Sequence, residues 1–338
     1  MKEASTTITN NKLIDKFGRQ VTYVRISVTD RCDFRCVYCM SEDMEFLPRA
    51  QVLTLEEITR LSRAFVEMGV TKIRITGGEP LVRNGIVDML ADISKLEGLD
   101  ELVITTNGSQ LEKLAQPLKD AGVKRLNVSL DTLDADKFKK ITRLGELSSV
   151  LKGIQAAKEA GFEKIKLNAV ILKNRNQDEV TDLVNYAIAE GLDISFIEEM
   201  PLGVINSHSR EEAYCSSDEI RQTIEQSFDL VSSQESTGGP SKYYNVEGSK
   251  SLIGFISPHS HNFCSSCNRV RVTASGLLLL CLGQEHSMDL KRVLRANPTD
   301  LNRVKQALVE SMDLKPEGHD FDMAEKPVIF RHMSVTGG

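Results

Sequence analysis

Apolar and polar residues alternate over 21–30 (VTYVRISVTD), where several residues are also β-branched. This pattern predicts a β-strand. Farther along, Thr54 and Glu57 have the spacing of a capping box, which predicts that a helix begins there. The apolar residues that follow keep the spacing of one helix face: Leu55, Ile58, Leu61, Phe65 and Met68.

A helix–glycine–strand signal then recurs five times. In each repeat a glycine is followed by an apolar residue and, shortly after, by a short apolar run; the glycines are Gly69, Gly98, Gly122, Gly161 and Gly191. Each glycine fits the left-handed position that ends a helix before a strand. With the first strand, the pattern predicts six β/α units with parallel strands near 22–29, 71–76, 101–106, 124–130, 165–171 and 193–198. A closed barrel of this class has eight strands, so the periodicity fits an incomplete barrel or an open doubly wound sheet.

Polar residues gather just after the ends of five predicted strands, in segments 30–32, 76–79, 105–107, 129–131 and 198–200. In parallel α/β proteins the carboxyl ends of the strands form the active-site face, so we expect these segments to meet at one mouth. Loops are often polar without having a function. Here, however, the first loop also carries three cysteines, which favours a functional site.

The pattern changes after about residue 200. Gly238-Gly239-Pro240 marks a turn, and helical periodicity returns near 300–312. Between them lie four short β-like runs, at 242–246, 252–257, 270–273 and 277–280. We predict an N-terminal extension (1–20), a barrel domain (21–200) and a β-rich domain (201–338), whose smaller antiparallel layer closes the open side of the barrel.

Composition and charge exclude several classes of partner. The chain is 41% hydrophobic and 27% charged, like an ordinary globular protein. Its 42 Lys and Arg against 48 Asp and Glu leave a net charge of −6, whereas duplex binding needs a basic surface. No apolar run approaches the roughly 20 residues that cross a bilayer, and the polar first ten residues do not resemble a secretory signal. We therefore expect a cytoplasmic protein that binds neither nucleic acid nor membranes.

Six of the seven cysteines form two triplets: Cys32, Cys36 and Cys39, then Cys264, Cys267 and Cys281. An odd total in tight clusters, with no export signal, is a poor disulfide framework and favours metal binding. Structural zinc and ferredoxin-type clusters usually take four protein ligands. Three thiolates around a [4Fe–4S] cluster would leave one iron open to an external ligand, where substrate chemistry can occur. Cys215 stands apart and fits an ordinary buried cysteine.

The second triplet leaves an alternative open. A zinc knuckle could be completed by His259, His261 or Cys215, although neither histidine has zinc-finger spacing. Arg269 and Arg271 lie between the ligands, on one face of a predicted strand. Guanidinium groups bind phosphate through two hydrogen bonds at once, so the pair suggests a phosphate site. A solvated, charged strand face is the alternative.

Two motifs are similar to signatures of radical S-adenosylmethionine enzymes. One is the first triplet, with Tyr38 before its last cysteine; the other is Thr76-Gly77-Gly78-Glu79-Pro80, which resembles the motif that contacts the methionyl amino group of the cofactor. From about Val21 to Gly338 the chain resembles the molybdenum-cofactor biosynthesis protein A family, the GTP 3′,8-cyclases. The specific features are both triplets, Arg269-x-Arg271 and the terminal Gly337-Gly338.

This resemblance implies an incomplete (β/α)6 barrel of the TIM type, followed by a β-rich α+β domain that holds a second [4Fe–4S] cluster. It implies reductive cleavage of S-adenosylmethionine to a 5′-deoxyadenosyl radical, which removes hydrogen from ribose C3′ of GTP before C3′ bonds to C8 of guanine. The product would be (8S)-3′,8-cyclo-7,8-dihydroguanosine 5′-triphosphate, in the first step of molybdenum cofactor biosynthesis. The second cluster would bind the guanine base through its open iron.

The resemblance also assigns residues. The cluster ligands would be the six triplet cysteines, Cys32, Cys36, Cys39, Cys264, Cys267 and Cys281. The S-adenosylmethionine contacts would be Tyr38, Gly78, Ser129 and Met200. The GTP contacts would be Arg25, Arg74, Thr105, Lys166, Arg269 and Arg271. Gly337 and Gly338 would enter the active site, anchored by the apolar run 328–330. Implied partners are GTP, an external one-electron donor and cyclic pyranopterin monophosphate synthase as the next enzyme, for a monomer or homodimer.

Two other functions compete with this interpretation. Peptide-modifying radical S-adenosylmethionine enzymes also carry extra clusters, but a peptide gives no reason for Arg269 and Arg271 beside the second triplet. A non-catalytic electron carrier would saturate its irons with four protein ligands. Formation of 5′-deoxyadenosine discriminates between them, because a carrier would form none and a peptide enzyme would form it independently of GTP.

Overall fold

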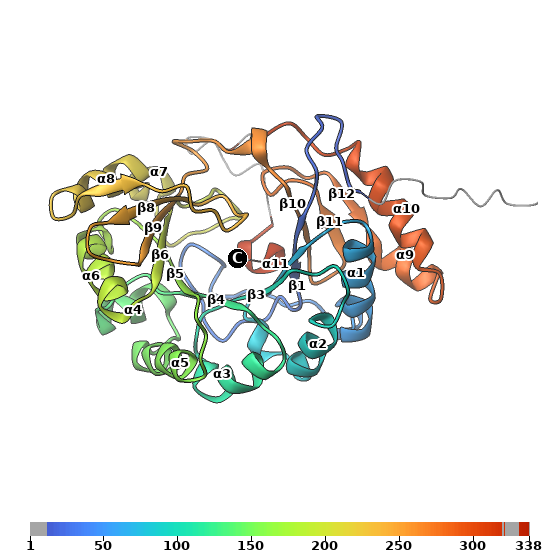
Figure 1. Cartoon of the computed structure of the whole chain (residues 1–338), viewed down its shortest axis with the longest axis horizontal. Coiled ribbons are helices and arrows are strands. Elements are labelled where there is room, and N and C mark those ends of the chain that lie inside the picture. The colour runs from blue at the N-terminus through green and yellow to red at the C-terminus, as the bar shows by residue number, and fades with distance from the viewer. Residues whose placement is uncertain (1–11, 320, 322–330, 338) are drawn as a thin grey trace, which may run out of the picture.

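The computed structural model describes residues 12–319, 321 and 331–337. Within these residues, twelve strands form one sheet in the order β12-β11-β10-β1-β2-β3-β4-β5-β6-β9-β8-β7. The sheet curves into an open barrel with helices around its outside (Figure 1). Its two end strands, β12 and β7, do not pair with each other, so the barrel is incomplete.

The six predicted parallel strands are confirmed. They are β1 (Tyr23–Ser27), β2 (Lys72–Thr76), β3 (Glu101–Thr106), β4 (Arg125–Ser129), β5 (Ile165–Val170) and β6 (Asp193–Ile197). The helices among them are α1 (Leu55–Glu67), α2 (Ile86–Ile93), α3 (Leu111–Asp120), α4 (Ala135–Thr142), α5 (Leu147–Glu159) and α6 (Val180–Glu190). All five predicted helix-ending glycines have positive φ, between 68° and 92°. The prediction of an incomplete (β/α)6 barrel is therefore confirmed.

Helix α1 illustrates how local sequence determines an element. The Thr54 side chain accepts from the Glu57 N–H at 3.2 Å, and the Glu57 carboxylate accepts from the Thr54 N–H at 2.8 Å, which completes the predicted capping box. The apolar face of the helix buries Ile58, Leu61 and Phe65 against the sheet.

The strands after residue 200 differ from the expected separate layer. They are β7 (Leu230–Ser232), β8 (Lys242–Val246), β9 (Leu252–Ile256), β10 (Arg269–Val272), β11 (Leu277–Leu279) and β12 (Ser287–Asp289). β9 pairs parallel with β6, and β10 pairs parallel with β1, so these strands extend both edges of the barrel sheet. Both edges would otherwise expose unpaired N–H and C=O groups, which pairing satisfies. Because one sheet runs through both predicted domains, the boundary at residue 200 stays a prediction.

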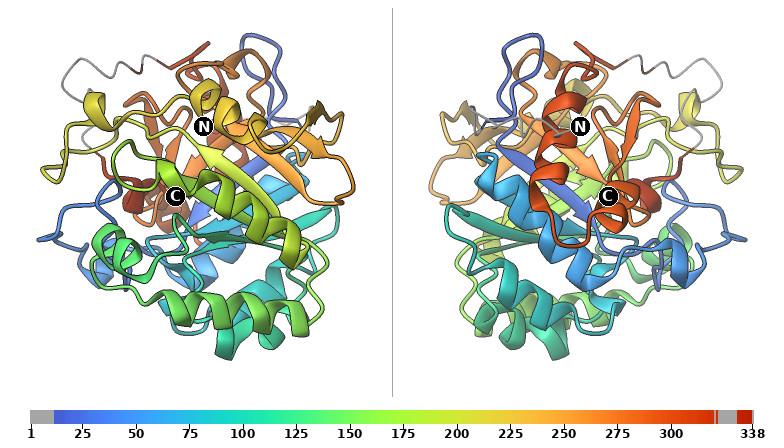
Figure 2. Two further views of the ribbon diagram at one scale, coloured as in Figure 1. Left: turned by 90° about the vertical axis from the view of Figure 1, so that its left-hand side faces the viewer. Right: turned by 90° about the vertical axis from the view of Figure 1, so that its right-hand side faces the viewer.

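The remaining helices follow residue 200: α7 (Arg210–Ala213), α8 (Ser217–Glu225), α9 (Leu290–Ala296), α10 (Leu301–Met312) and α11 (Met333–Thr336). The right-hand view of Figure 2 shows α9 and α10, in orange, beside α1, in blue. Ion pairs of 2.7 Å between Arg295 and Glu57 and of 2.9 Å between Lys305 and Glu67 join them. The C-terminal segments thus cover the barrel flank next to β1. None of the helices in the described ranges is long and apolar enough to cross a membrane.

Candidate active site

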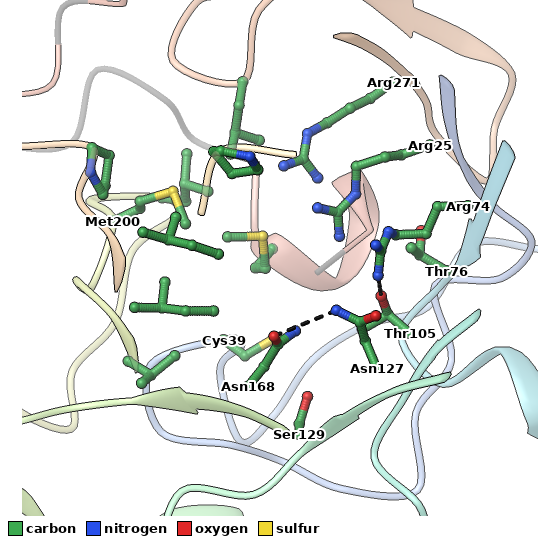
Figure 3. A pocket seen from close by; sticks show the side chains of 18 of the residues that line it. Arg25, Cys39, Arg74, Thr76, Thr105, Asn127, Ser129, Asn168, Met200 and Arg271 are labelled. Atoms are coloured by element: carbon green, nitrogen blue, oxygen red, sulfur yellow. Dashed lines mark hydrogen bonds between the residues drawn. The ribbon is translucent and has the colours of Figure 1, made fainter. Parts of the chain in front are cut away.

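A cavity of about 2120 Å³, counted out to its open mouth, lies inside the barrel (Figure 3). All six triplet cysteines line it, and so do all ten residues predicted to contact S-adenosylmethionine or GTP. The cavity also brings together residues from the polar strand-end segments, including Asn107, Asp131 and Glu199.

The first triplet lies on the loop after β1. Two backbone hydrogen bonds of 2.9 Å fasten this loop to α4: Arg35 N–H donates to Thr142 O and Val37 N–H to Ile141 O. Burial raises the pKa of all three thiols, to about 12 for Cys39, and the neighbouring thiols raise that of Cys36 further. Three buried thiols that repel one another as anions favour a bound metal centre, which supplies the missing positive charge.

The Gly-Gly-Glu-Pro segment packs directly on the cysteine loop. Gly78 N–H donates to Thr29 O at 2.7 Å, and a Cβ on Gly78 would lie 2.4 Å from the Arg31 carbonyl oxygen. Glu79 is fully buried and accepts from the Thr106 hydroxyl at 2.8 Å and the Asn107 N–H at 2.7 Å. Burial nevertheless raises the pKa of Glu79 to about 7. Gly77 and Gly78 of this segment line the cavity, and the Glu79 carboxyl group is buried behind them, where a nearby cation would stabilise its ionised form.

Asp131 and Asn107, to which the sequence assigned no individual role, support this region. The Tyr38 hydroxyl donates to Asp131 Oδ2 at 2.7 Å, and Val170 N–H donates to Asp131 Oδ1 at 2.8 Å. Asn107 Nδ2 donates to Asp33 Oδ1 at 2.6 Å and lies 3.8 Å from Cys32 Sγ. Their only signal in the sequence was that Asn107 and Asp131 follow strand ends.

A row of guanidinium groups crosses the barrel wall. In the strand register Arg25 is the partner of Arg271 on one side and of Arg74 on the other, and all three side chains point into the cavity (Figure 3). Burial, with a smaller effect from the charge of Arg269, lowers the pKa of Arg271 to about 10. Burial, with a smaller effect from the charge of Arg74, lowers the pKa of Lys166 to about 7. Like charges on adjacent strands are destabilising, so this row favours a polyanionic ligand.

Hydrogen bonds hold the row in place. Arg74 donates from Nη1 to the Thr105 hydroxyl at 2.9 Å and from Nε to the Tyr23 hydroxyl. Burial raises the pKa of Tyr23, but the charges of Arg74, Arg25 and Lys72 outweigh it and lower the pKa to about 7. Lys166 Nζ donates to the Tyr243 hydroxyl at 3.2 Å. The sequence analysis missed Tyr23, which lines the cavity, and Tyr243, which accepts from Lys166, because nothing in a strand pattern marks an aromatic residue as a polar contact.

The second triplet lies beside β10, the strand next to β1, with Cys264 and Cys267 before β10 and Cys281 after β11. Burial raises the pKa of Cys267, but Arg269 and Lys315 outweigh it, so the pKa is lowered. The residues of the zinc-knuckle alternative are engaged elsewhere: His259 with Glu199 O at 3.0 Å, His261 with Asp218 at 2.9 Å, and Cys215 in the hydrophobic core. Among the described residues, no three His, Cys, Asp or Glu side chains are placed to hold a single metal ion.

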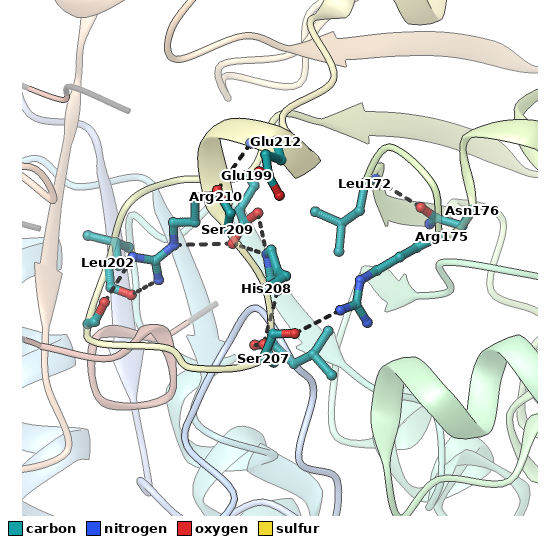
Figure 4. A network of polar contacts seen from close by, with 12 residues as sticks. Leu172, Arg175, Asn176, Glu199, Leu202, Ser207, His208, Ser209, Arg210 and Glu212 are labelled. Carbon is teal, nitrogen blue, oxygen red and sulfur yellow. Dashed lines mark hydrogen bonds and ion pairs between the residues drawn. The ribbon is translucent and has the colours of Figure 1, made fainter. Parts of the chain in front are cut away.

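The loop after β6 holds a network of polar contacts (Figure 4). The buried Glu199 carboxylate pairs with His208 Nε2 at 2.9 Å and with Arg210 Nε at 3.2 Å. The Ser207 hydroxyl donates to Val37 O at 2.9 Å, inside the first triplet. Glu199 directly precedes Met200, so this network holds the predicted cofactor-contacting residue against the cysteine loop.

The C-terminal segment reaches the cavity wall. The Gly337 carbonyl oxygen accepts a hydrogen bond from Arg271, and a Cβ on Gly337 would lie 2.0 Å from Thr76 Oγ1. Gly337 also has φ of +79°, which favours glycine. Gly338 and the anchoring run 328–330 lie outside the described residues.

Comparison with known families divides the chain in two. Residues 26–187 match the radical SAM superfamily, and residues 192–321 match the family described as Molybdenum Cofactor Synthesis C. A protein of Saccharophagus degradans named GTP 3′,8-cyclase is 59% identical over 97% of this chain and 99% of its own length. The Pseudomonas aeruginosa protein named GTP 3′,8-cyclase 2 is 58% identical over 98% of this chain and 100% of its own. The chain belongs to the GTP 3′,8-cyclase family.

Membership confirms the predicted family and its place in molybdenum cofactor synthesis, and the radical SAM match implies a [4Fe–4S] cluster and S-adenosylmethionine. The fold of this cyclase has solved counterparts. SuiB of Streptococcus suis, solved with bound S-adenosylmethionine, covers 95% of this chain with a TM-score of 0.63. At 16% identity, that likeness concerns the fold alone.

Proposed function

We propose that the barrel cavity joins ribose C3′ to guanine C8 of GTP, with one [4Fe–4S] cluster on each cysteine triplet. The observation that carries the proposal is that both triplets and the guanidinium row open into the same cavity. When bound, the first cluster and S-adenosylmethionine supply the one-electron chemistry that starts the reaction. The residues of the chain bind, orient and enclose the reactants.

The surroundings of the first triplet suit S-adenosylmethionine. The Thr76–Pro80 segment would hold the methionyl ammonium group at Gly77 and Gly78, and the nearby positive charge would lower the raised pKa of the buried Glu79. Gly78 brings the backbone close to the cysteine loop, and Tyr38 is oriented by Asp131. Ser129 and Met200 line the same part of the cavity from the ends of β4 and β6.

The guanidinium row suits the triphosphate. Arg25, Arg269 and Arg271 would bind phosphate oxygens through charge-assisted hydrogen bonds, and Arg74, Lys166 and Thr105 would complete the contacts. The second triplet lies at the end of this row, so its open iron would receive the guanine base. The bound triphosphate would also compensate the buried positive charge that depresses the pKa values of Arg271 and Lys166.

The proposed reaction also needs an electron source and an enzyme that uses its product. An external one-electron donor would reduce the first cluster, and cyclic pyranopterin monophosphate synthase would consume the product. We place the enzyme in the cytoplasm as a monomer or homodimer.

The test is an anaerobic incubation of the reconstituted protein with S-adenosylmethionine, a reductant and each nucleoside triphosphate in turn. We expect 5′-deoxyadenosine and a cyclised nucleotide with GTP alone, detected by mass. Cys36→Ala should abolish cofactor cleavage, and Cys267→Ala should mainly impair GTP turnover. If 5′-deoxyadenosine forms at the same rate without GTP, and no nucleotide is changed, the proposal is wrong.

One observation supports a second candidate substrate, a peptide. A SuiB structure of the same fold contains a precursor peptide, so a peptide substrate is the alternative for this cavity. Arg25, Arg74 and Arg271 argue for a phosphorylated substrate instead. A GTP-independent cleavage that is stimulated by a peptide would favour the alternative.

A further inference from the structure

A buried ammonium group lies beside the second triplet. Lys315 is 2% exposed, and its Nζ donates to Cys267 Sγ at 3.7 Å. In the part of the chain that the structure describes, this sulfur is the only hydrogen-bond acceptor of the ammonium. A buried charge is destabilising unless an opposite charge lies beside it, so the Lys315 ammonium favours the thiolate form of Cys267.

The segment 315–318 is fastened over the triplet. Arg19 donates to the carbonyl oxygen of Cys264 at 2.8 Å and to those of Pro316 at 2.5 Å and Glu317 at 2.6 Å. Lys315 N–H donates to Met312 O at 3.0 Å, at the end of α10. These contacts tie the segment to the triplet and to a helix, so they hold the backbone of Lys315 beside Cys267.

The first triplet has the opposite surroundings. Its polar neighbours include the carboxyl groups of Glu79, Asp33 and Asp131. The donors to Cys32 Sγ are neutral: the Phe34 N–H at 3.3 Å and the Asn107 amide at 3.8 Å. The second triplet instead has Lys315 and Arg269 beside it. Charge near a cluster and hydrogen bonds to its sulfurs set its reduction potential.

We propose that Lys315 donates a hydrogen bond to the Cys267 thiolate and raises the reduction potential of the second cluster. The inference rests on the proposed function in one respect, namely that the second triplet holds an iron–sulfur cluster. Reduction adds one electron to that cluster and moves no proton, so a fixed positive charge stabilises the reduced form. Lys315 is a positioning residue, because it acts through Cys267.

Three variants separate charge from packing. Lys315→Met keeps the length of the side chain and removes the charge, and Lys315→Arg keeps the charge. Lys305→Met is the matched control, because Lys305 pairs with Glu67 on the flank of the barrel and does not contact the triplet. Each variant is reconstituted anaerobically and titrated with a reductant while electron paramagnetic resonance follows both clusters. The signal that changes on addition of S-adenosylmethionine identifies the first cluster.

In Lys315→Met we expect the ratio of reduced to oxidised second cluster, at a fixed solution potential, to fall by about tenfold, which is 59 mV for a one-electron couple. Lys315→Arg and Lys305→Met should stay close to the unmodified protein, and the first cluster should not change in any variant. Loss of the second cluster from Lys315→Met but not from Lys315→Arg would also support the proposal.

An unchanged second-cluster potential in Lys315→Met would overturn the proposal, as would equal loss of the cluster from both Lys315 variants. Iron content and circular dichroism show whether each variant is folded and retains the first cluster. Failure of the proposed function is distinguishable, because the unmodified protein would then show no second-cluster signal before any variant is made.

Discussion

At the scale of single residues, positive charge in the cavity serves binding at the expense of stability. Arg269 and Arg271 alternate with apolar residues along β10, and Arg271 stands beside Arg25. A charge-assisted hydrogen bond is worth roughly 1.5–3 kcal/mol. Arg269→Ala or Arg271→Ala should therefore weaken GTP binding by roughly tenfold to a hundredfold, measured by calorimetry on the reconstituted protein.

The cluster content and the affinity for S-adenosylmethionine should not change in these arginine variants. Arg295→Ala is the control, because Arg295 pairs with Glu57 outside the cavity. An unchanged GTP affinity in the Arg269→Ala, Arg271→Ala double variant would contradict the phosphate assignment.

Glu79 predicts a pH dependence of stability. Its pKa is about 7 in the folded protein against an ordinary value of 4.5, so the unfolded chain releases this proton at lower pH than the folded protein does. Stability from this group is therefore greatest at low pH and falls as the pH rises from about 4.5 to about 7. Glu79→Gln should reduce the loss of unfolding free energy between pH 5 and pH 8 by about 2 kcal/mol, measured by urea unfolding of the cluster-free protein. Identical pH profiles for the two proteins would show that Glu79 is ionised when buried.

At the scale of elements, the turn after β2 and the loop after β1 depend on each other. A Cβ on Gly78 would meet the Arg31 backbone, which cannot move without shifting the loop that begins at Cys32. Gly78→Ala should therefore lose the first cluster and keep the second, so that iron content falls by half and cofactor cleavage is lost.

Gly161→Ala is a matched control for this substitution. Gly161 has φ of +78°, and a Cβ added there would have no neighbouring atom within 4 Å, so alanine brings strain but no clash. We expect it to cost about 1 kcal/mol of stability and to leave iron content unchanged. Full iron content in Gly78→Ala would mean that the two loops adjust independently.

At the scale of the whole molecule, the C-terminal segment meets the barrel wall at the cavity. The C-terminal Gly337 contacts Arg271 on β10 and packs against Thr76 on β2. Deleting Gly337 and Gly338 should leave folding, both clusters and GTP binding intact, while formation of the cyclised nucleotide falls by orders of magnitude. Gly337→Ala should behave similarly, because its Cβ would clash with Thr76.

Product analysis and GTP calorimetry on the same samples test the role of this tail. Gly191→Ala provides the control, since Gly191 ends α6 far from the tail in sequence and has open space around it. Near-normal turnover by the truncated enzyme would show that the terminal glycines have no part in the reaction.

The sequence alone determined the six parallel strands and the helix-ending glycines, whereas the residues predicted to contact S-adenosylmethionine and GTP came from the resemblance to a family. The strands and glycines follow from signals a few residues long: apolar periodicity, the positive φ of a glycine such as Gly98, and a capping box at Thr54. Only the tertiary structure decided that β9 and β10 extend the two barrel edges rather than form a separate layer.

It also decided the partners Asp131, Tyr23 and Lys315. The physical reason is the same in each case. The pairing of β1 with β10 satisfies backbone groups of two segments that are distant in the chain. The contact of Lys315 with Cys267 likewise joins distant segments, because it compensates a buried charge. A local sequence pattern does not predict which distant group will pair with a backbone group or a buried charge, because the packing of the whole molecule determines the partner.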